Sequence, residues 1–245
     1  MRYEIEKHLL PLQGTKNTRD IGGYPTKDGK ITRTGMFLRS DDPSGLTADD
    51  IQTLKSLGLK LQIDLRSTME TGLNPSALSE CGFLNYEKVP LLDHMNSAVS
   101  ITELPDSLLS IYLELLENSK DSFARIFKLF ADCEGTALFN CTAGKDRTGL
   151  TAMLLLSLAQ VPEDIITEDY AASEIFLEAK ISGQEQLLSS QGITVPRTLL
   201  GSPKENMVQT LEHIHHNYGS AESYLLGCGV SAREIYTIKE RLVMS

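Results

Sequence analysis

Residues 137–151 read ALFNCTAGKDRTGLT, an apolar run followed by one cysteine and a polar stretch that holds glycine, lysine, aspartate and arginine. The apolar residues 136–140 (TALFN) predict a short buried strand. Residues 149–160 (GLTAMLLLSLAQ) predict a helix that is apolar on nearly every side and is therefore buried. The polar loop thus joins a buried strand to the N-terminus of a buried helix.

Further strands and helices alternate on both sides of this unit, which predicts an α/β fold with a central, mostly parallel sheet flanked by helices. The C-terminal half is predicted to be helical. Neither a repeat nor a linker divides the chain, so we expect one domain over residues 1–245. The pattern predicts strands at 31–40, 59–67 and 83–91, a turn at Asp28-Gly29, helices at 47–57, 104–118, 121–132, 163–180, 204–217, 220–227 and 231–242, and irregular structure at 13–29 and 185–203.

The chain carries 33 acidic and 23 basic residues, a formal net charge of −10. Such a field repels polyanions, so we expect no nucleic-acid partner, and an anionic substrate must be attracted by a local basic pocket. No stretch approaches the roughly 18 apolar residues of a membrane span, so we expect no stable membrane insertion. The expected location is cytoplasmic, or secreted if a leader was removed or a non-standard export route is used. The oligomeric state is left open.

The loop has the chemistry of an anion site. Ligands of open α/β sheets bind beyond the carboxyl ends of the strands, and a helix N-terminus there offers unpaired N–H groups and partial positive charge. Lys145 and Arg147 add full charges, and a guanidinium fits phosphate with a bidentate fork. Cys141 lies among these charges, which favour its thiolate. A thiolate that faces an oxyanion pocket is a nucleophile directed at a phosphate ester.

Two other interpretations of the loop are weaker. A nucleotide-binding loop reads GxxxxGK[ST], whereas here Asp146 follows the lysine and Phe139 stands at the first glycine position. A lone cysteine is ordinarily an inert buried thiol. The C-x5-R-T spacing, Gly144 and the flanking strand and helix favour a catalytic Cys141 instead.

The segment NCTAGKDRTG (140–149) resembles the C-x5-R-[ST] signature loop of the cysteine-dependent protein tyrosine phosphatases. Its GKDRT form is similar to that of the atypical bacterial tyrosine/serine phosphatases, which share lysine-bearing loops with lipid phosphatases that act on phosphoinositides. The resemblance covers most of the chain and implies a protein-tyrosine-phosphatase-like fold. It extends, in order and spacing, to NTRDIGGY (17–24), GMFLRSD (35–41), IDLRSTME (63–70) and YGSAESYLLGCGVSAREI (218–235).

The resemblance implies hydrolysis of phosphate monoesters through a Cys141 phospho-cysteine intermediate. Arg147 and the loop amides would bind the phosphoryl oxygens, and Thr148 would hydrogen-bond the sulfur and ease its departure. No metal or other cofactor is implied. The implied partners are phosphorylated proteins, with phosphotyrosine first and phosphoserine/threonine next, or phosphoinositides, which an added cation at Lys145 would suit. The substrate-binding residues are expected to be Thr142, Ala143, Gly144, Lys145, Asp64 and Arg66.

Three carboxylates are candidates for the general acid that protonates the leaving oxygen. Asp146, inside the loop, is where the resembled bacterial family places it, and we favour this residue. Asp93 resembles the movable-loop aspartate of lipid and dual-specificity phosphatases. Asp64, at the end of a predicted strand, could also face the pocket, although pairing with Arg66 or Arg39 is its simpler role.

One residue departs from the resembled family, because Asn140 stands where histidine normally precedes the cysteine. An amide offers both a donor and an acceptor, so we expect Asn140 to hold the loop backbone in part and the enzyme to be weaker but active. A catalytically weak phosphate-binding pseudophosphatase is one alternative function. A rhodanese-like sulfurtransferase is another, because its loop also surrounds a cysteine with amides, although the Asp-Arg-Thr ending argues against it.

Arg19, Arg39 and Arg66 each lie at a loop or strand end. They are expected either to line the phosphate entrance or to pair with nearby carboxylates, and both roles stay open. The candidate carboxylates are Asp20, Asp41 and Asp64.

Three further features carry weaker expectations. The histidines 213, 215 and 216 do not share one helix face, which disfavours a metal site. Cys133 could form a protective disulfide with Cys141 under oxidation. The amphipathic helix at 163–180 is expected to pack on the core, or to cover the active site as a lid as the resemblance implies.

Overall fold

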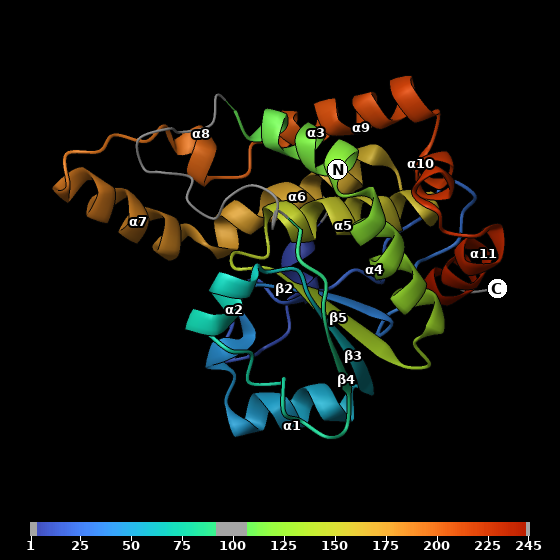
Figure 1. The fold of residues 1–245 in the computed structure, drawn as a ribbon, viewed down its shortest axis with the longest axis horizontal. Helices are drawn as coiled ribbons and strands as arrows, with labels where there is room; N and C mark the ends of the chain where they lie inside the picture. The colour runs from blue at the N-terminus through green and yellow to red at the C-terminus, as the bar shows by residue number, and fades with distance from the viewer. Residues whose placement is uncertain (1–3, 92–106, 244–245) are drawn as a thin grey trace.

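The computed structural model describes residues 4–91 and 107–243. Its centre is a five-stranded sheet of order β1-β2-β5-β3-β4 (Figure 1). The pair β1–β2 is antiparallel and the other pairs are parallel. The strand bounds are Arg19–Asp20 (β1), Phe37–Ser40 (β2), Leu59–Asp64 (β3), Asn85–Lys88 (β4) and Thr136–Asn140 (β5).

Helices cover both faces of the sheet, which confirms the predicted α/β class (Figure 1). The larger layer contains α3 (Leu108–Asn118), α4 (Lys120–Asp132), α5 (Asp146–Leu158), α6 (Glu163–Phe176), α9 (Lys204–Tyr218), α10 (Ala221–Cys228) and α11 (Ala232–Leu242), whereas α1 (Ala48–Ser56) and α2 (Thr68–Leu73) lie on the other side. Within the described ranges, no helix is both long and apolar enough to cross a membrane.

Strand β5 separates two hydrophobic cores because its side chains alternate between the two faces of the sheet. Ala137 and Phe139 join the large core under α3–α6 and α9–α11, whereas Leu138 joins a smaller core beneath α1. All five residues of β5 are buried. This position explains the uninterrupted apolar run, because a strand covered on both faces has no solvent side.

Most predicted elements are present, and their local signals are visible in the structure. Thr47 caps α1 and forms a reciprocal capping box with Asp50. The turn at Asp28-Gly29 is present, with Gly29 at φ 82° and an antiparallel bridge between Pro25 and Ile31. The helix after the loop begins at Asp146, earlier than the predicted 149, and is buried along its length as expected.

Four segments differ from the sequence prediction. The predicted helix 163–180 ends at Phe176, and a second helix, α7 (Glu178–Ser190), continues in a new direction away from the body (Figure 1). Residues 185–203, predicted to be irregular, contain the end of α7 and the short α8 (Arg197–Leu200). The two-residue strand β1 and the helix α2 were not predicted, because each is short and depends on its neighbours for its stability.

Candidate active site

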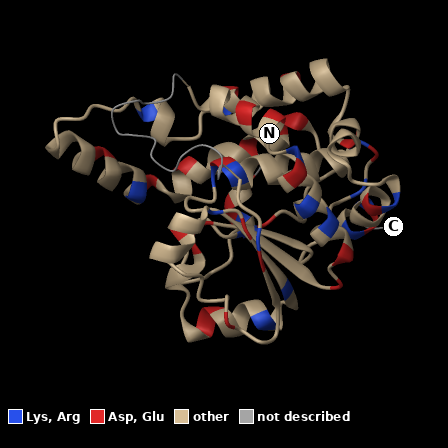
Figure 2. Ribbon diagram, in the orientation of Figure 1, with Lys and Arg blue, Asp and Glu red and all other residues tan. Residues whose placement is uncertain are grey.

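The structure places Cys141 directly after β5, at the carboxyl end of the central strand, where it is 2% exposed. The next four residues turn the chain, and α5 begins at Asp146. Figure 2 shows acidic and basic segments together in this region, where the strands end beneath α5 and α6. The sulfur therefore lies at a helix N-terminus, where backbone dipoles favour negative charge.

The loop backbone is held from outside by donors that bind its carbonyl groups. Asn17 Nδ2 donates to the carbonyls of Ala143 and Gly144, at 3.0 and 3.1 Å, and Arg39 Nη2 donates to Gly144 O at 2.8 Å. The Thr142 carbonyl accepts from Lys180 Nζ at 3.2 Å. In a trans peptide the N–H points opposite to the preceding carbonyl. The N–H groups of residues 143–145 therefore point away from these donors, as an anion cradle requires.

Gly144 makes this close packing of the loop possible. It has φ +65°, and a Cβ at this position would lie 2.6 Å from backbone atoms of Ser40 and Asp41. Any side chain would therefore push the loop away from the end of β2 and would also have to adopt a left-handed conformation.

A buried ion cluster holds Arg39, the arginine that donates to the Gly144 carbonyl of the loop. Asp169 of α6 accepts from Arg19 Nε at 2.8 Å through one carboxyl oxygen and from Arg39 Nη1 through the other. Both arginines are 0% exposed and Asp169 is 1% exposed. Burial by itself raises the pKa of Asp169, but the charges of Arg19 and Arg39 outweigh it and hold the pKa well below its usual value. Arg19 and Arg39 thus pair with Asp169, which sequence reasoning missed, rather than with Asp20 or Asp41.

Arg147, in the first turn of α5, is held by a carboxylate from α2. Its Nη1 and Nη2 donate to Glu70 at 2.8 and 2.7 Å, and Glu70 also accepts from the Thr142 hydroxyl and from Ser67 N. Burial lowers the pKa of Arg147, but Glu70 and the Cys141 sulfur outweigh it and raise the pKa above its usual value. Glu70 was not identified from the sequence; its capping-box position after Ser67 is the only local signal.

Asp64 and Arg66 pair with each other at the end of β3. Arg66 donates to both carboxyl oxygens of Asp64, at 2.9 and 2.7 Å, and its Nη1 also reaches Asp42 at 2.7 Å. Asp64 and Arg66 are both 0% exposed. Of the two roles open for Asp64, the structure thus shows the pairing with Arg66, in a cluster that neighbours the loop.

Asn140 bonds to β3 side chains, not to the loop backbone as expected. Its Oδ1 accepts from Gln62 Nε2 at 2.8 Å, and its Nδ2 donates to Asp64 Oδ1 at 3.3 Å. The side chain of a residue within β5 projects from the sheet beside β3, which is why it finds these partners. The residue before Cys141 therefore links the loop to the Asp64–Arg66 pair.

Lys145 is buried beside the loop and contacts backbone oxygens. Its Nζ donates to the carbonyls of Leu200 and Gly201, at 2.9 and 2.8 Å, and lies 3.5 Å from Asp146 Oδ1. The same Asp146 oxygen accepts from the Tyr112 hydroxyl of α3. The charge of Lys145 is thus near the site, but its two hydrogen bonds point toward the end of α8 and its ion pair toward Asp146.

Thr148 and Asp93 are the remaining candidates from the sequence. Thr148 is fully buried, and its Oγ1 has no hydrogen-bond partner among the residues that the structure describes, so the expected bond to the Cys141 sulfur is not formed in this state. Asp93 lies outside the described residues.

The remaining sequence expectations have structural answers. Cys133 and Cys141 flank opposite ends of β5, a strand of about 17 Å by its length, and a disulfide needs Cα atoms within about 7 Å. The protective disulfide is therefore excluded in this fold.

His213 lies 3.1 Å from Glu117, whereas His215 faces Glu163, so these histidines do not share a partner. Helix α6, within the predicted range 163–180, packs on the core as expected. Lys180, at the start of α7, reaches the loop by donating to Thr142 O at 3.2 Å, and the expected cover over the active site stays a prediction.

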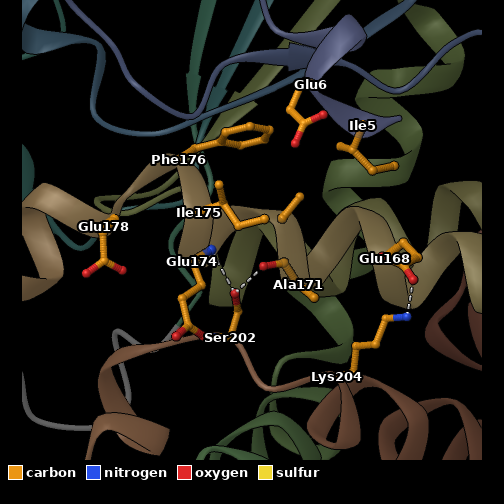
Figure 3. A pocket seen from close by; sticks show the side chains of 11 residues that line it. Ile5, Glu6, Glu168, Ala171, Glu174, Ile175, Phe176, Glu178, Ser202 and Lys204 are labelled. Atoms are coloured by element: carbon orange, nitrogen blue, oxygen red, sulfur yellow. Dashed lines mark hydrogen bonds and ion pairs between the residues drawn. The ribbon is translucent and has the colours of Figure 1, made fainter. Parts of the chain in front are cut away.

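A separate open cavity of about 530 Å³ lies between α6, the N-terminal segment and the chain that enters α9 (Figure 3). Two of its carboxylates have partners: Glu168 pairs with Lys204, and Glu174 accepts from Ser202 N at 2.9 Å. Cys141 and Arg147 do not line it. This cavity is therefore not the catalytic pocket.

Comparison with known proteins identifies the class of this fold and site. The tyrosine phosphatase family matches residues 10–244. A tyrosine-protein phosphatase of Nostoc commune is 35% identical, over 84% of this chain and 74% of that protein. A putative tyrosine-protein phosphatase of Cupriavidus necator is 27% identical, over 89% of this chain and 83% of that protein. The triple specificity protein phosphatase PtpB of Mycobacterium tuberculosis is 32% identical, over 90% of this chain and 94% of that protein.

The fold and the loop thus define a phosphoric monoester hydrolase of the protein-tyrosine-phosphatase class. The chain belongs to the tyrosine phosphatase family, as its resemblance indicated.

We expect Asp169→Asn to destabilise the fold by about 3–5 kcal/mol at pH 7, because it leaves two buried arginines without their counter-charge. Since the folded pKa of Asp169 is depressed, its contribution is complete above the unfolded pKa and falls as the pH drops below about 5. Urea unfolding at several pH values should therefore show a shallower loss of stability toward pH 3 in the variant. Asp164→Asn, an exposed change on the same helix, is the control. Equal pH slopes for wild type and Asp169→Asn would contradict this assignment.

We expect Glu70→Gln to lower kcat/KM about tenfold or more, because a charge-assisted pair that orients Arg147 is weakened while its shape is kept. Steady-state kinetics with p-nitrophenyl phosphate measures the effect, and thermal unfolding reports any loss from the α2 cap. Glu87→Gln is the matched control, since Glu87 pairs with Arg125 at the same 2.7 Å on the exposed β4 edge. Similar kinetics in both variants would show that Glu70 does not position Arg147.

Proposed function

We propose that this protein hydrolyses phosphotyrosine and related phosphate monoesters through a covalent intermediate on Cys141. One arrangement carries the proposal: a buried cysteine at the end of the central strand, followed by amides turned away from the outer donors and by Arg147 in the first turn of α5. Charge that develops on the three equatorial oxygens of a transferring phosphoryl group needs preorganised donors of this kind.

The reaction has two steps. The Cys141 thiolate forms a bond to phosphorus, the bond from phosphorus to the ester oxygen breaks, and that oxygen takes a proton from a general acid. Water then gives one proton to the carboxylate left by the general acid and attacks phosphorus, the sulfur–phosphorus bond breaks, and inorganic phosphate leaves as the thiolate is restored. Arg147 and the amides of residues 143–145 bind the phosphoryl oxygens in both steps.

Thr148 supports the second step. Its Oγ1 is buried and has no partner within the described part of the chain, although buried hydroxyls nearly always have one. A rotation about χ1 directs this hydroxyl toward a new acceptor, and the sulfur of residue 141 becomes a stronger acceptor as it leaves phosphorus. We therefore assign to Thr148 the stabilisation of the leaving thiolate.

Asp146 is the proposed general acid. It is the first residue of α5, and its side chain is 29% exposed, so it reaches solvent at the loop that also contains Cys141 and Arg147. By contrast, Asp64 is fully buried and engaged with Arg66. Asp93 is the remaining rival.

The proposed substrate range is phosphotyrosine first, then phosphoserine and phosphothreonine. The similarity to a phosphatase named for triple specificity supports this breadth. For phosphoinositides the support is weaker, because Lys145, the cation expected to bind additional phosphates, has its ammonium on the carbonyls of Leu200 and Gly201. Lipid hydrolysis would need Lys145 to exchange these contacts for substrate.

Replacing Cys141 by serine should lower hydrolysis of a phosphotyrosine peptide at least about 1,000-fold, because the nucleophile is lost. Rapid acid quench with radiolabelled substrate should trap protein-bound phosphate in wild type and none in the variant. Cys228→Ser, which alters another buried cysteine in α10, is the control and should keep full activity. Retained activity in Cys141→Ser would refute the proposal, and thiosulfate-to-cyanide transfer without phosphatase activity would indicate sulfur transfer instead.

Asp146→Asn should slow turnover about 100-fold for phenyl phosphate, whose leaving group needs a proton. Turnover of 2,4-dinitrophenyl phosphate, whose leaving group departs as a stable anion, should change little. Both rates are measured as kcat at one pH, and Asp93→Asn is measured with the same two substrates. A larger selective defect in Asp93→Asn would move the acid role to that residue.

A further inference from the structure

Three helices bring a chain of hydroxyl groups to the proposed acid. The Tyr112 hydroxyl of α3 donates to Asp146 Oδ1 at the start of α5, and it shares a hydrogen bond of 2.7 Å with the Tyr170 hydroxyl of α6. The two rings pack edge to face with centroids 6.0 Å apart. Tyr112 is 0% exposed and Tyr170 is 1% exposed, so packing holds both hydroxyls in place.

Both contacts of the Asp146 carboxyl described above fall on one oxygen. Lys145 Nζ approaches the same Oδ1, at 3.5 Å, that accepts from Tyr112. The terminal torsion of an aspartate is broad and roughly two-fold, so the side chain alone does not decide which oxygen faces which way. The Tyr112 hydrogen bond and the Lys145 ion pair both engage Oδ1 and thereby select the oxygen that faces these groups.

The tyrosines remain donors over the working range of the enzyme. Burial first, and then the neighbouring Asp146 charge, raise the pKa of Tyr112 well above its usual value. Burial and Asp146 also raise the pKa of Tyr170. The Tyr112 proton therefore stays on its oxygen and is not the proton transferred to substrate.

We propose that Tyr112, oriented by Tyr170, is a positioning residue that presents Asp146 Oδ2 to the leaving oxygen of the substrate. This inference rests on the proposed role of Asp146 as general acid. In the first step the proton moves from Oδ2 to the ester oxygen while its bond to phosphorus breaks, and the carboxyl becomes a carboxylate. The bond from Tyr112 to Oδ1 then becomes charge-assisted, which roughly doubles its strength. The interaction thus stabilises the transition state more than the ground state.

Tyr112→Phe keeps the buried ring and removes the hydroxyl. We expect kcat for phenyl phosphate to fall about tenfold, the loss of one hydrogen bond to a developing charge. For 2,4-dinitrophenyl phosphate we expect less than about a twofold change, because that leaving group needs no proton. The matched control is Tyr224→Phe: Tyr224 is also fully buried, and its hydroxyl donates to Leu116 O in the same helix, α3, at 2.7 Å. That variant should not distinguish the two substrates.

The double variant Tyr112→Phe with Asp146→Asn gives a second measurement. If Tyr112 acts through Asp146, the tyrosine change adds little to the phenyl phosphate defect of Asp146→Asn. Additive defects, or equal defects on both substrates in Tyr112→Phe, would overturn the positioning role and leave a structural one. If Asp146→Asn shows the selective defect on phenyl phosphate and Tyr112→Phe does not, the positioning role of Tyr112 is refuted and the acid role of Asp146 stands. An Asp146→Asn variant without selectivity removes the acid assignment itself.

Discussion

The outward direction of the loop carbonyls is the constraint on which this site depends. Asn17 and Arg39 bind the carbonyls of Ala143 and Gly144, and the planar peptide turns the following N–H groups the other way. Without those donors, buried carbonyl oxygens would have no partner, and the loop would relax toward a geometry that repels an anion. The geometry of the loop is therefore set as much by the N-terminal segment as by the loop itself.

Buried charge holds that arrangement in place. Asp169 binds Arg19 and Arg39, and Arg39 carries the constraint on to Gly144. On the opposite side of the loop, Glu70 binds both Arg147 and the Thr142 hydroxyl. Removing one member of such a group leaves an uncompensated charge, which costs far more than the intact pair contributes. The loop after Cys141 is thus coupled to helices α2 and α6, which lie far from it along the chain.

Part of this site was predictable from the sequence and part was not, and the difference follows from distance along the chain. The cysteine, the arginine and the helix that follows them lie within one short segment, so spacing alone identified them. Glu70 meets Arg147 across 77 residues, and Asp169 meets Arg19 across 150. No local pattern marks such pairs. The α6–α7 break was missed for a related reason, since apolar and polar residues continue through it without a strong helix stop.

By itself the sequence determined an α/β sheet with a buried central strand, and a cysteine and an arginine at the helix that follows it. Those features are encoded by short-range periodicity and by residue types whose chemistry acts within a few positions. Only the tertiary structure decided which carboxylate each arginine binds, where the Lys145 ammonium points and which oxygen of Asp146 is held by Tyr112. These outcomes depend on side chains that meet because separate helices pack against one sheet, and packing of that kind is a property of the whole fold.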